Sequence, residues 1–145
     1  MYCSLGVPMT SHIGEASESV NRPDEMTLDR RVIAEFGRGL GGAVPEFVAA
    51  LIGEFIEEAA VQVERMRDAG QRLDAPAMKA SAHGLRGSSM MLGAKRLGFL
   101  CEQLERVAGQ PGTFARPEAL LSDLDQEFVK VRYALRAELQ GAGER

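Results

Sequence analysis

The sequence predicts an all-α protein, an up-down antiparallel four-helix bundle with an additional N-terminal helix. Apolar residues recur every three to four positions through most of residues 24–140, which is the period of a helix. No segment shows the alternation of apolar and polar residues that marks a strand, and no internal repeat is visible. The predicted connections are short, which favours antiparallel neighbouring helices.

The length and composition indicate one domain with a modest aliphatic core. The chain has 145 residues, of which 45% are hydrophobic and only 6% aromatic. Residues 1–23 are rich in Ser, Glu and Gly and include Pro8 and Pro23, so we expect a flexible N-terminal tail. We assign residues 24–140 to the bundle and residues 141–145 to a disordered C-terminus.

Glycines separate the first two predicted helices. The first covers about residues 28–36, and the glycine cluster at 37–42 predicts a loop after it. The second covers about residues 44–69, and Gly70 is placed to end it. Its inward stripe has apolar residues at helical spacing. These are Val48, Leu51, Ile52, Phe55, Ala59, Val63 and Met66.

Three further helices complete the bundle. The third follows Asp74, a good N-cap, has Pro76 in its first turn and is ended by Gly93. The fourth covers about residues 94–108 and the fifth about 117–139, with a loop at 110–113. Their inward stripes are Met78, Ala82, Leu85, Ser89 and Leu92, then Leu97, Leu100, Cys101 and Leu104, then Leu120, Leu121, Leu124, Phe128, Val131 and Leu135.

The third helix carries His83, the one histidine outside the N-terminal tail. The residues on its face, at 100° per residue, are Lys79, Ala80, Arg86, Gly87 and Met90. The inward stripe lies to the other side, so we expect the imidazole at the solvent surface. Gly inside a helix costs about 0.8–1 kcal/mol relative to Ala. Gly87 leaves space over the ring, and for Gly84 we expect close packing against a neighbouring helix.

Positive charge gathers around this helix, although the net charge of the chain is −4. Residues 75–96 contain four cations and no acid, whereas the rest of the chain has 13 Lys and Arg against 21 Asp and Glu. The four cations are Lys79, Arg86, Lys95 and Arg96. Such a basic strip argues for a local anionic target and against a general nucleic-acid surface.

Several features of other protein classes are missing from the sequence. It has no G-x-x-x-x-G-K-S/T loop, so we expect no P-loop nucleotide site. We see no signal peptide, and no apolar stretch reaches the roughly 20 residues of a membrane span. The two cysteines, Cys3 and Cys101, are far apart, which favours a reducing compartment. We expect a cytoplasmic protein that binds no membrane. We also expect no metal site, because His12, His83 and Cys101 do not have the spacing of metal ligands.

The most distinctive part of the sequence is Ala82-His83-x-Leu85-Arg86-Gly87-Ser88-Ser89-x-x-Leu92-Gly93-Ala94, followed by Leu97, Leu100, Cys101 and Leu104-Glu105. This pattern resembles a histidine-containing phosphotransfer (HPt) domain. The resemblance covers about residues 28–139. In that family the histidine carries a phosphoryl group between receiver domains of a multistep phosphorelay. The resemblance implies that His83 is the acceptor and donor and that Arg86, where the family usually has lysine, supplies charge.

The resemblance also implies a phosphoryl carrier without an ATP site or cofactor of its own. Its partners would be the receiver domain of a hybrid histidine kinase and that of a response regulator, each with a divalent metal in its own acidic pocket. Lys79 is not part of this motif. We include it as a candidate support for the transfer because it lies about one turn before His83 on the same face of the helix. We expect a monomer that docks its partners through Lys79, Ala80, Met90 and Lys95.

Two alternatives stay open at this point. A helical adaptor would dock on a receiver or kinase without chemistry. A bundle domain of a sensor kinase or phosphatase would dimerise and would depend on an acid near the histidine. The sequence argues against the second alternative, because Gly84 follows the histidine directly and we expect no acid nearby.

Overall fold

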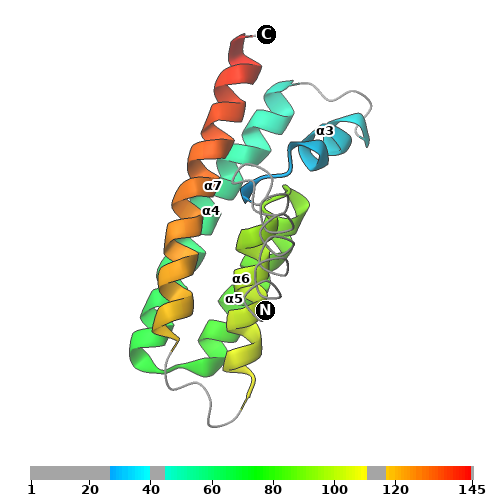
Figure 1. The fold of residues 1–145 in the computed structure, drawn as a ribbon. Coiled ribbons are helices and arrows are strands. Elements are labelled where there is room, and N and C mark those ends of the chain that lie inside the picture. The colour runs from blue at the N-terminus through cyan, green and yellow to red at the C-terminus, as the bar shows by residue number, and fades with distance from the viewer. Residues whose placement is uncertain (1–26, 40–44, 111–116, 145) are drawn as a thin grey trace, which may run out of the picture.

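The computed structural model describes residues 27–39, 45–110 and 117–144. These ranges form helices and contain no strand. The helices are α3 (Arg30–Gly39), α4 (Pro45–Arg72), α5 (Ala75–Met91), α6 (Lys95–Ala108) and α7 (Glu118–Glu144). Helices α4 to α7 run alternately up and down, and α3 lies beside the end at which α5 turns into α6 (Figure 1). The predicted four-helix bundle with an additional N-terminal helix is therefore confirmed.

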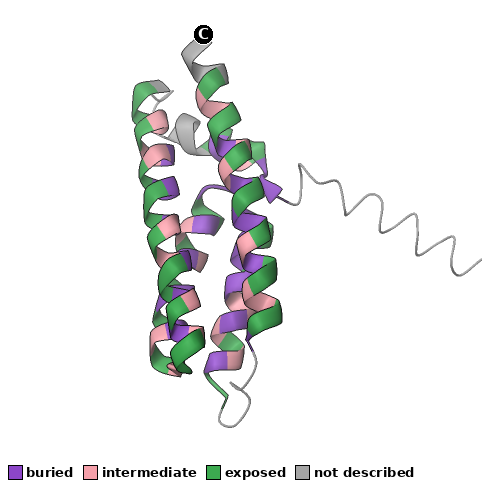
Figure 2. Ribbon diagram, turned by 90° about the vertical axis from the view of Figure 1, so that its left-hand side faces the viewer, coloured by how far each residue is buried: buried purple, intermediate pink, exposed green. Residues whose placement is uncertain are grey.

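The bundle buries one apolar core (Figure 2). Helix α5 packs against α4 and α6, and α7 packs against the same two helices. The outward face of α5 is consequently on the opposite side of the bundle from α7. Every residue of the predicted inward stripes of α5 and α6 is buried. Four residues of the other stripes are only half-buried, namely Val48, Leu51, Leu120 and Leu121.

The end of α4 differs from the prediction. Gly70 does not end the helix, which continues to Arg72. The residue with the left-handed backbone is instead Leu73, at φ 54°. Gly70 has a packing role, because a Cβ there would lie 2.7 Å from Cδ1 of Leu121 on α7. Glycine at this position lets α4 and α7 approach each other closely.

The limits of α5 agree with the prediction. The Asp74 side chain accepts a hydrogen bond from the backbone N–H of Ala77 at 3.1 Å, as expected of an N-cap. Pro76 lies in the first turn. The helix ends at Met91, and Gly93 follows with a left-handed φ of 83°.

Asp29 anchors the segment before α3 to the turn between α5 and α6. Its backbone N–H donates to the carbonyl oxygen of Gly93 at 2.8 Å, and a Cβ on Gly93 would lie 2.5 Å from the Asp29 carbonyl oxygen. Its carboxylate accepts from Arg31 Nε at 3.1 Å and binds Lys95 Nζ at 2.9 Å. The hydrogen bonds from Arg31 and Lys95 hold the pKa of Asp29 well below its usual range.

Two helix ends extend beyond their predicted limits. Helix α3 continues through Gly37 to Gly39, so this part of the glycine cluster is helical. Helix α7 continues to Glu144 and includes residues 141–144, which the sequence assigned to a disordered C-terminus. Glycine weakens a helix by about 1 kcal/mol but does not exclude helical backbone angles. The predicted tail at 1–23, the glycines at 40–42 and the loop at 111–113 lie outside the described residues.

No helix in the described part of the chain is long and apolar enough to cross a bilayer.

Candidate functional site

The imidazole of His83 projects into solvent from the middle of α5. Its side chain is 72% exposed, although Ala82 and Leu85 on either side of it are fully buried. The predicted exposure is therefore confirmed. The core stripe of α5 fixes the rotation of the helix, and that rotation directs His83 outward.

Glu105 of α6 connects His83 to Arg86. Its Oε2 lies 2.9 Å from Nδ1 of His83, and its Oε1 lies 3.3 Å from Nη1 of Arg86. The Glu105 side chain is only 17% exposed, so the carboxylate lies under the more exposed imidazole. The expectation that no acid lies near the histidine is wrong. Glu105 belongs to the neighbouring helix and is 22 positions from His83 in the chain, so the local sequence around the histidine does not reveal it.

The protonation state of Glu105 determines which nitrogen of His83 is available. Burial raises the pKa of Glu105, but hydrogen bonds from His83 and Arg86 lower it by more, so the net shift is downward. An ionised carboxylate only accepts hydrogen bonds. Nδ1 of His83 is therefore the nitrogen that carries the hydrogen. In the neutral ring, Nε2 keeps its lone pair and faces away from Glu105.

The two predicted supporting cations lie on the α6 side of His83. They share a shallow hollow of about 330 Å³ with Glu102, Glu105, Arg106, Gly109 and Gln110. Lys79 extends towards the end of α6, with Nζ 3.9 Å from the place of a Cβ on Gly109. Arg86 is held by Glu105. Both cations are thus near the histidine face, in a hollow where acids accompany them.

The predicted basic strip is largely neutralised in the fold. Arg86 pairs with Glu105, Lys95 with Asp29 at 2.9 Å and Arg96 with the buried Glu127 at 3.3 Å. All three acids lie outside residues 75–96. The charges of that segment alone therefore do not show that its cations are paired with acids. Lys95 was predicted to help dock a partner, yet it lies past the C-terminal end of α5 at the anchor of α3.

The surface around His83 is open, as predicted from Gly87. A Cβ added at Gly87 would meet no atom within 4 Å, and Ala80 is exposed. The same is true of Gly84, so its predicted close packing against another helix is wrong. The close approach of α5 and α6 occurs at Gly98, where a Cβ would lie 2.8 Å from Sδ of Met90. Met90 remains 48% exposed and available for contact.

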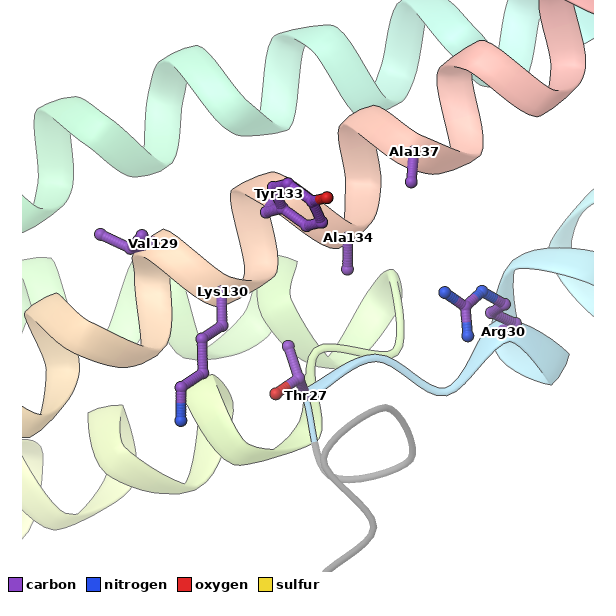
Figure 3. Close-up of a pocket in the computed structure, with 7 residues that line it drawn as sticks. All are labelled: Thr27, Arg30, Val129, Lys130, Tyr133, Ala134 and Ala137. Carbon is purple, nitrogen blue, oxygen red and sulfur yellow. The ribbon is translucent and has the colours of Figure 1, made fainter.

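Other parts of the described structure do not offer comparable chemistry. A hollow of about 420 Å³ lies along α7 (Figure 3). It is lined by Thr27, Arg30, Val129, Lys130, Tyr133, Ala134 and Ala137. Its lining contains no histidine and comes from α7, from Arg30 of α3 and from Thr27 before α3, and not from α5. Cys101 is fully buried, and burial raises the pKa of its thiol to about 12. His12 lies outside the described residues.

The described part of the bundle exposes one histidine beside a half-buried carboxylate, an arrangement that fits a phosphotransfer domain. A model of the family described as "Hpt domain" matches residues 50–143. The chain therefore belongs to the Hpt domain family, and the resemblance found in the sequence is confirmed.

Solved structures agree with this assignment. Histidine-containing phosphotransfer protein B (HptB) from Pseudomonas aeruginosa PAO1 is 29% identical, with a TM-score of 0.71 over 79% of this chain and 95% of that chain. The HPT domain of a sensor hybrid histidine kinase from Shewanella is 19% identical, with a TM-score of 0.68 over 81% of this chain and 97% of that chain, and supports the fold. No curated protein matches this chain.

The family assignment establishes the kind of function. The chain is a histidine phosphotransfer protein of phosphorelays, a phosphocarrier rather than an enzyme in the usual sense. Its partners belong to two-component phosphorelays, in which hybrid kinases and receiver domains take part. The comparisons do not favour the adaptor alternative.

Proposed function

We propose that His83 is the residue that accepts and donates the phosphoryl group and that Nε2 is the reacting atom. The observation that carries this proposal is the 2.9 Å contact between Glu105 and Nδ1, which leaves Nε2 as the solvent-facing nitrogen of an exposed ring. A neutral imidazole with a free lone pair is a competent nucleophile.

The transfer is an in-line displacement at phosphorus. The Nε2 lone pair forms a bond to phosphorus as the bond from phosphorus to the aspartyl oxygen of the receiver breaks, and the carboxylate leaves with that electron pair. The ring keeps its hydrogen on Nδ1 and gains positive charge. The Glu105 carboxylate stabilises that charge through its hydrogen bond to Nδ1. The reverse sequence passes the group to the next receiver.

Arg86 and Lys79 support the reaction by charge. The transferred group carries negative oxygens, and both cations are on the His83 face of α5. Arg86 also restrains the Glu105 carboxylate at 3.3 Å, so it positions the group that holds the ring. Gly87 leaves room for the receiver to reach Nε2.

The proposal extends to the partners. The donor is the receiver domain of a hybrid histidine kinase and the acceptor is the receiver of a response regulator. The divalent metal that assists the transfer belongs to the receiver, whereas this chain contributes no cofactor, ATP site or further catalytic activity. Docking involves Lys79, Ala80 and Met90, and Lys95 only at the edge of the surface. The chain acts as a monomer in the cytoplasm.

A labelling experiment tests this proposal. The protein is incubated with a receiver domain phosphorylated on its aspartate with radioactive phosphate. We expect acid-labile label on the wild-type chain and none on His83→Gln. His12→Gln is the matched control, because it removes the other histidine of the chain and should label normally. Equal labelling of wild type and His83→Gln would refute the proposal, and binding without label would support the adaptor.

A further inference from the structure

An apolar groove lies between α4 and α5, on the other side of His83 from the hollow that holds Lys79 and Arg86. It has a volume of about 240 Å³. Leu51 and Phe55 of α4 and Met91 and Leu92 of α5 form its apolar wall, and Glu54 and Glu58 lie on its rim. Phe55 and Leu92 are buried, whereas Met91 is 60% exposed. No Lys or Arg lines this groove.

The groove falls within the area that a receiver domain must cover to reach His83. Ser88 and Met91 line it and follow His83 by five and eight residues, which is about 7.5 and 12 Å along a helix axis. A standard protein interface buries about 800 Å² per partner, equivalent to a disc about 16 Å in radius. A receiver centred on His83 therefore extends over the groove.

The two sides of His83 differ in chemistry. On the α6 side, the lining of the hollow has three cations, Lys79, Arg86 and Arg106, against the two acids Glu102 and Glu105, and this net positive charge suits the phosphoryl group and acidic pocket of a receiver. On the α4 side, an exposed methionine and an apolar wall are bordered by carboxylates alone. A partner matches both sides in one orientation only, because rotation by half a turn would place its acidic pocket against Glu54 and Glu58.

We infer that the α4–α5 groove accepts an apolar side chain of the receiver domain, flanked on that domain by basic residues, and that this contact sets the orientation of the receiver on His83. The inference rests on the proposed function of His83. It assigns to Leu51, Met91 and Glu54 a role in partner selection, away from the reacting atoms.

The test separates docking from chemistry by means of two phosphoryl donors. One is a phosphorylated receiver. The other is phosphoramidate, which phosphorylates an imidazole by losing ammonia and needs no docking surface. For Met91→Asp we expect KM for the receiver to rise about 10-fold with little change in kcat, and labelling by phosphoramidate to stay at the wild-type rate. Tyr133→Asp is the matched control, since Tyr133 is 79% exposed on α7 and should leave KM unchanged.

A charge reversal tests the acidic rim. Glu54→Lys should raise KM for the receiver several-fold by repelling its basic flank, whereas Glu57→Lys, an exposed neighbour that does not line the groove, should have a smaller effect. The inference is overturned if Met91→Asp and Tyr133→Asp give the same KM, or if Met91→Asp slows labelling by phosphoramidate as well. Failure of the wild-type chain to be labelled on His83 by either donor would instead overturn the proposed function, and this inference with it.

Discussion

Oε2 of Glu105 lies 2.9 Å from Nδ1 of His83, although the two residues are 22 positions apart in the chain. His83 lies eleven residues before Ala94, and Glu105 lies eleven residues after it. The tight turn at Gly93 folds α6 back along α5 and pairs positions at equal distances from the turn. The register of this helical hairpin therefore determines which nitrogen of the histidine reacts.

Loss of the Glu105 carboxylate should slow phosphotransfer without unfolding the bundle. A hydrogen bond to a charged group is worth about 1.5–3 kcal/mol, so we expect Glu105→Ala to reduce the rate about 10- to 100-fold. Glu105→Gln keeps an acceptor oxygen and should retain most of the rate. Single-turnover transfer from a phosphorylated receiver measures both. Nitrogen NMR of His83 should show a larger share of the tautomer with hydrogen on Nε2 in the alanine variant.

Glu102→Ala is the control for this prediction. Glu102 lies one turn before Glu105 on α6 and binds Arg106 rather than His83. It should transfer at the wild-type rate. A normal rate and a normal tautomer ratio in Glu105→Ala would show that the carboxylate does not position the ring.

Alanine substitutions at Gly87 and Gly84 should stabilise the protein to the same extent but should affect phosphotransfer differently. A Cβ at either position meets no atom within 4 Å, so alanine adds helix propensity without a clash. Each substitution should raise the free energy of unfolding by about 0.8–1 kcal/mol, measured by urea denaturation. Gly87→Ala should lower transfer from the receiver, because its methyl group occupies open space beside His83 that the receiver needs in order to reach Nε2. Gly84→Ala should lower it less, and an equal loss in both variants would contradict the assigned role of Gly87.

Much of this structure is accessible from sequence because it depends on local rules. The apolar stripes place Ala82 and Leu85 inside and His83 outside, and Asp74 and Gly93 mark the ends of α5. The contacts of Glu105, Asp29 and Glu127 are different. Each pairs with a cation from another helix or turn, and only the three-dimensional register brings the partners together. That is why the acid beside the histidine and the neutralisation of the basic strip were missed.

The anchor of α3 should weaken in acid. The pKa of Asp29 is lowered in the folded protein, so its contribution to stability is present above the pKa of an unfolded aspartate, about 3.9, and is lost as the pH falls below it. Because this loss is complete only as the pH falls through the lowered pKa of Asp29, Asp29→Asn should reduce the free energy of unfolding at pH 7 and reduce it by a smaller amount near pH 2. Urea denaturation at both pH values measures this. Asp123→Asn, at an exposed position of α7, is the control and should leave the free energy of unfolding unchanged at both pH values. An equal loss of free energy of unfolding from Asp29→Asn at both pH values would contradict the prediction.

Each of the two turns on either side of α5 contains one residue with a left-handed backbone. Substitution of that residue should have opposite effects on protein stability in the two turns. Leu73 has φ 54°, where a side chain costs about 1 kcal/mol, so Leu73→Gly should stabilise the protein by about that amount. Gly93 has φ 83° and has the Asp29 carbonyl oxygen where a Cβ would stand, so Gly93→Ala should destabilise it by about 2 kcal/mol or more. Thermal unfolding measures both. A destabilised Leu73→Gly would show that the exposed leucine stabilises the turn by another route.

Arg86 should be replaceable by lysine but not by alanine. Its guanidinium lies 3.3 Å from Glu105 and supplies positive charge beside the phosphoryl site. Arg86→Lys keeps the charge and should transfer within about 3-fold of wild type, whereas Arg86→Ala should lose about 10-fold, the effect of one charge-assisted hydrogen bond. Arg106→Ala is the matched control, because Arg106 lines the same hollow but binds Glu102. If Arg86→Ala and Arg106→Ala slow the transfer equally, general positive charge in the hollow is sufficient, and Arg86 has no specific role at the histidine.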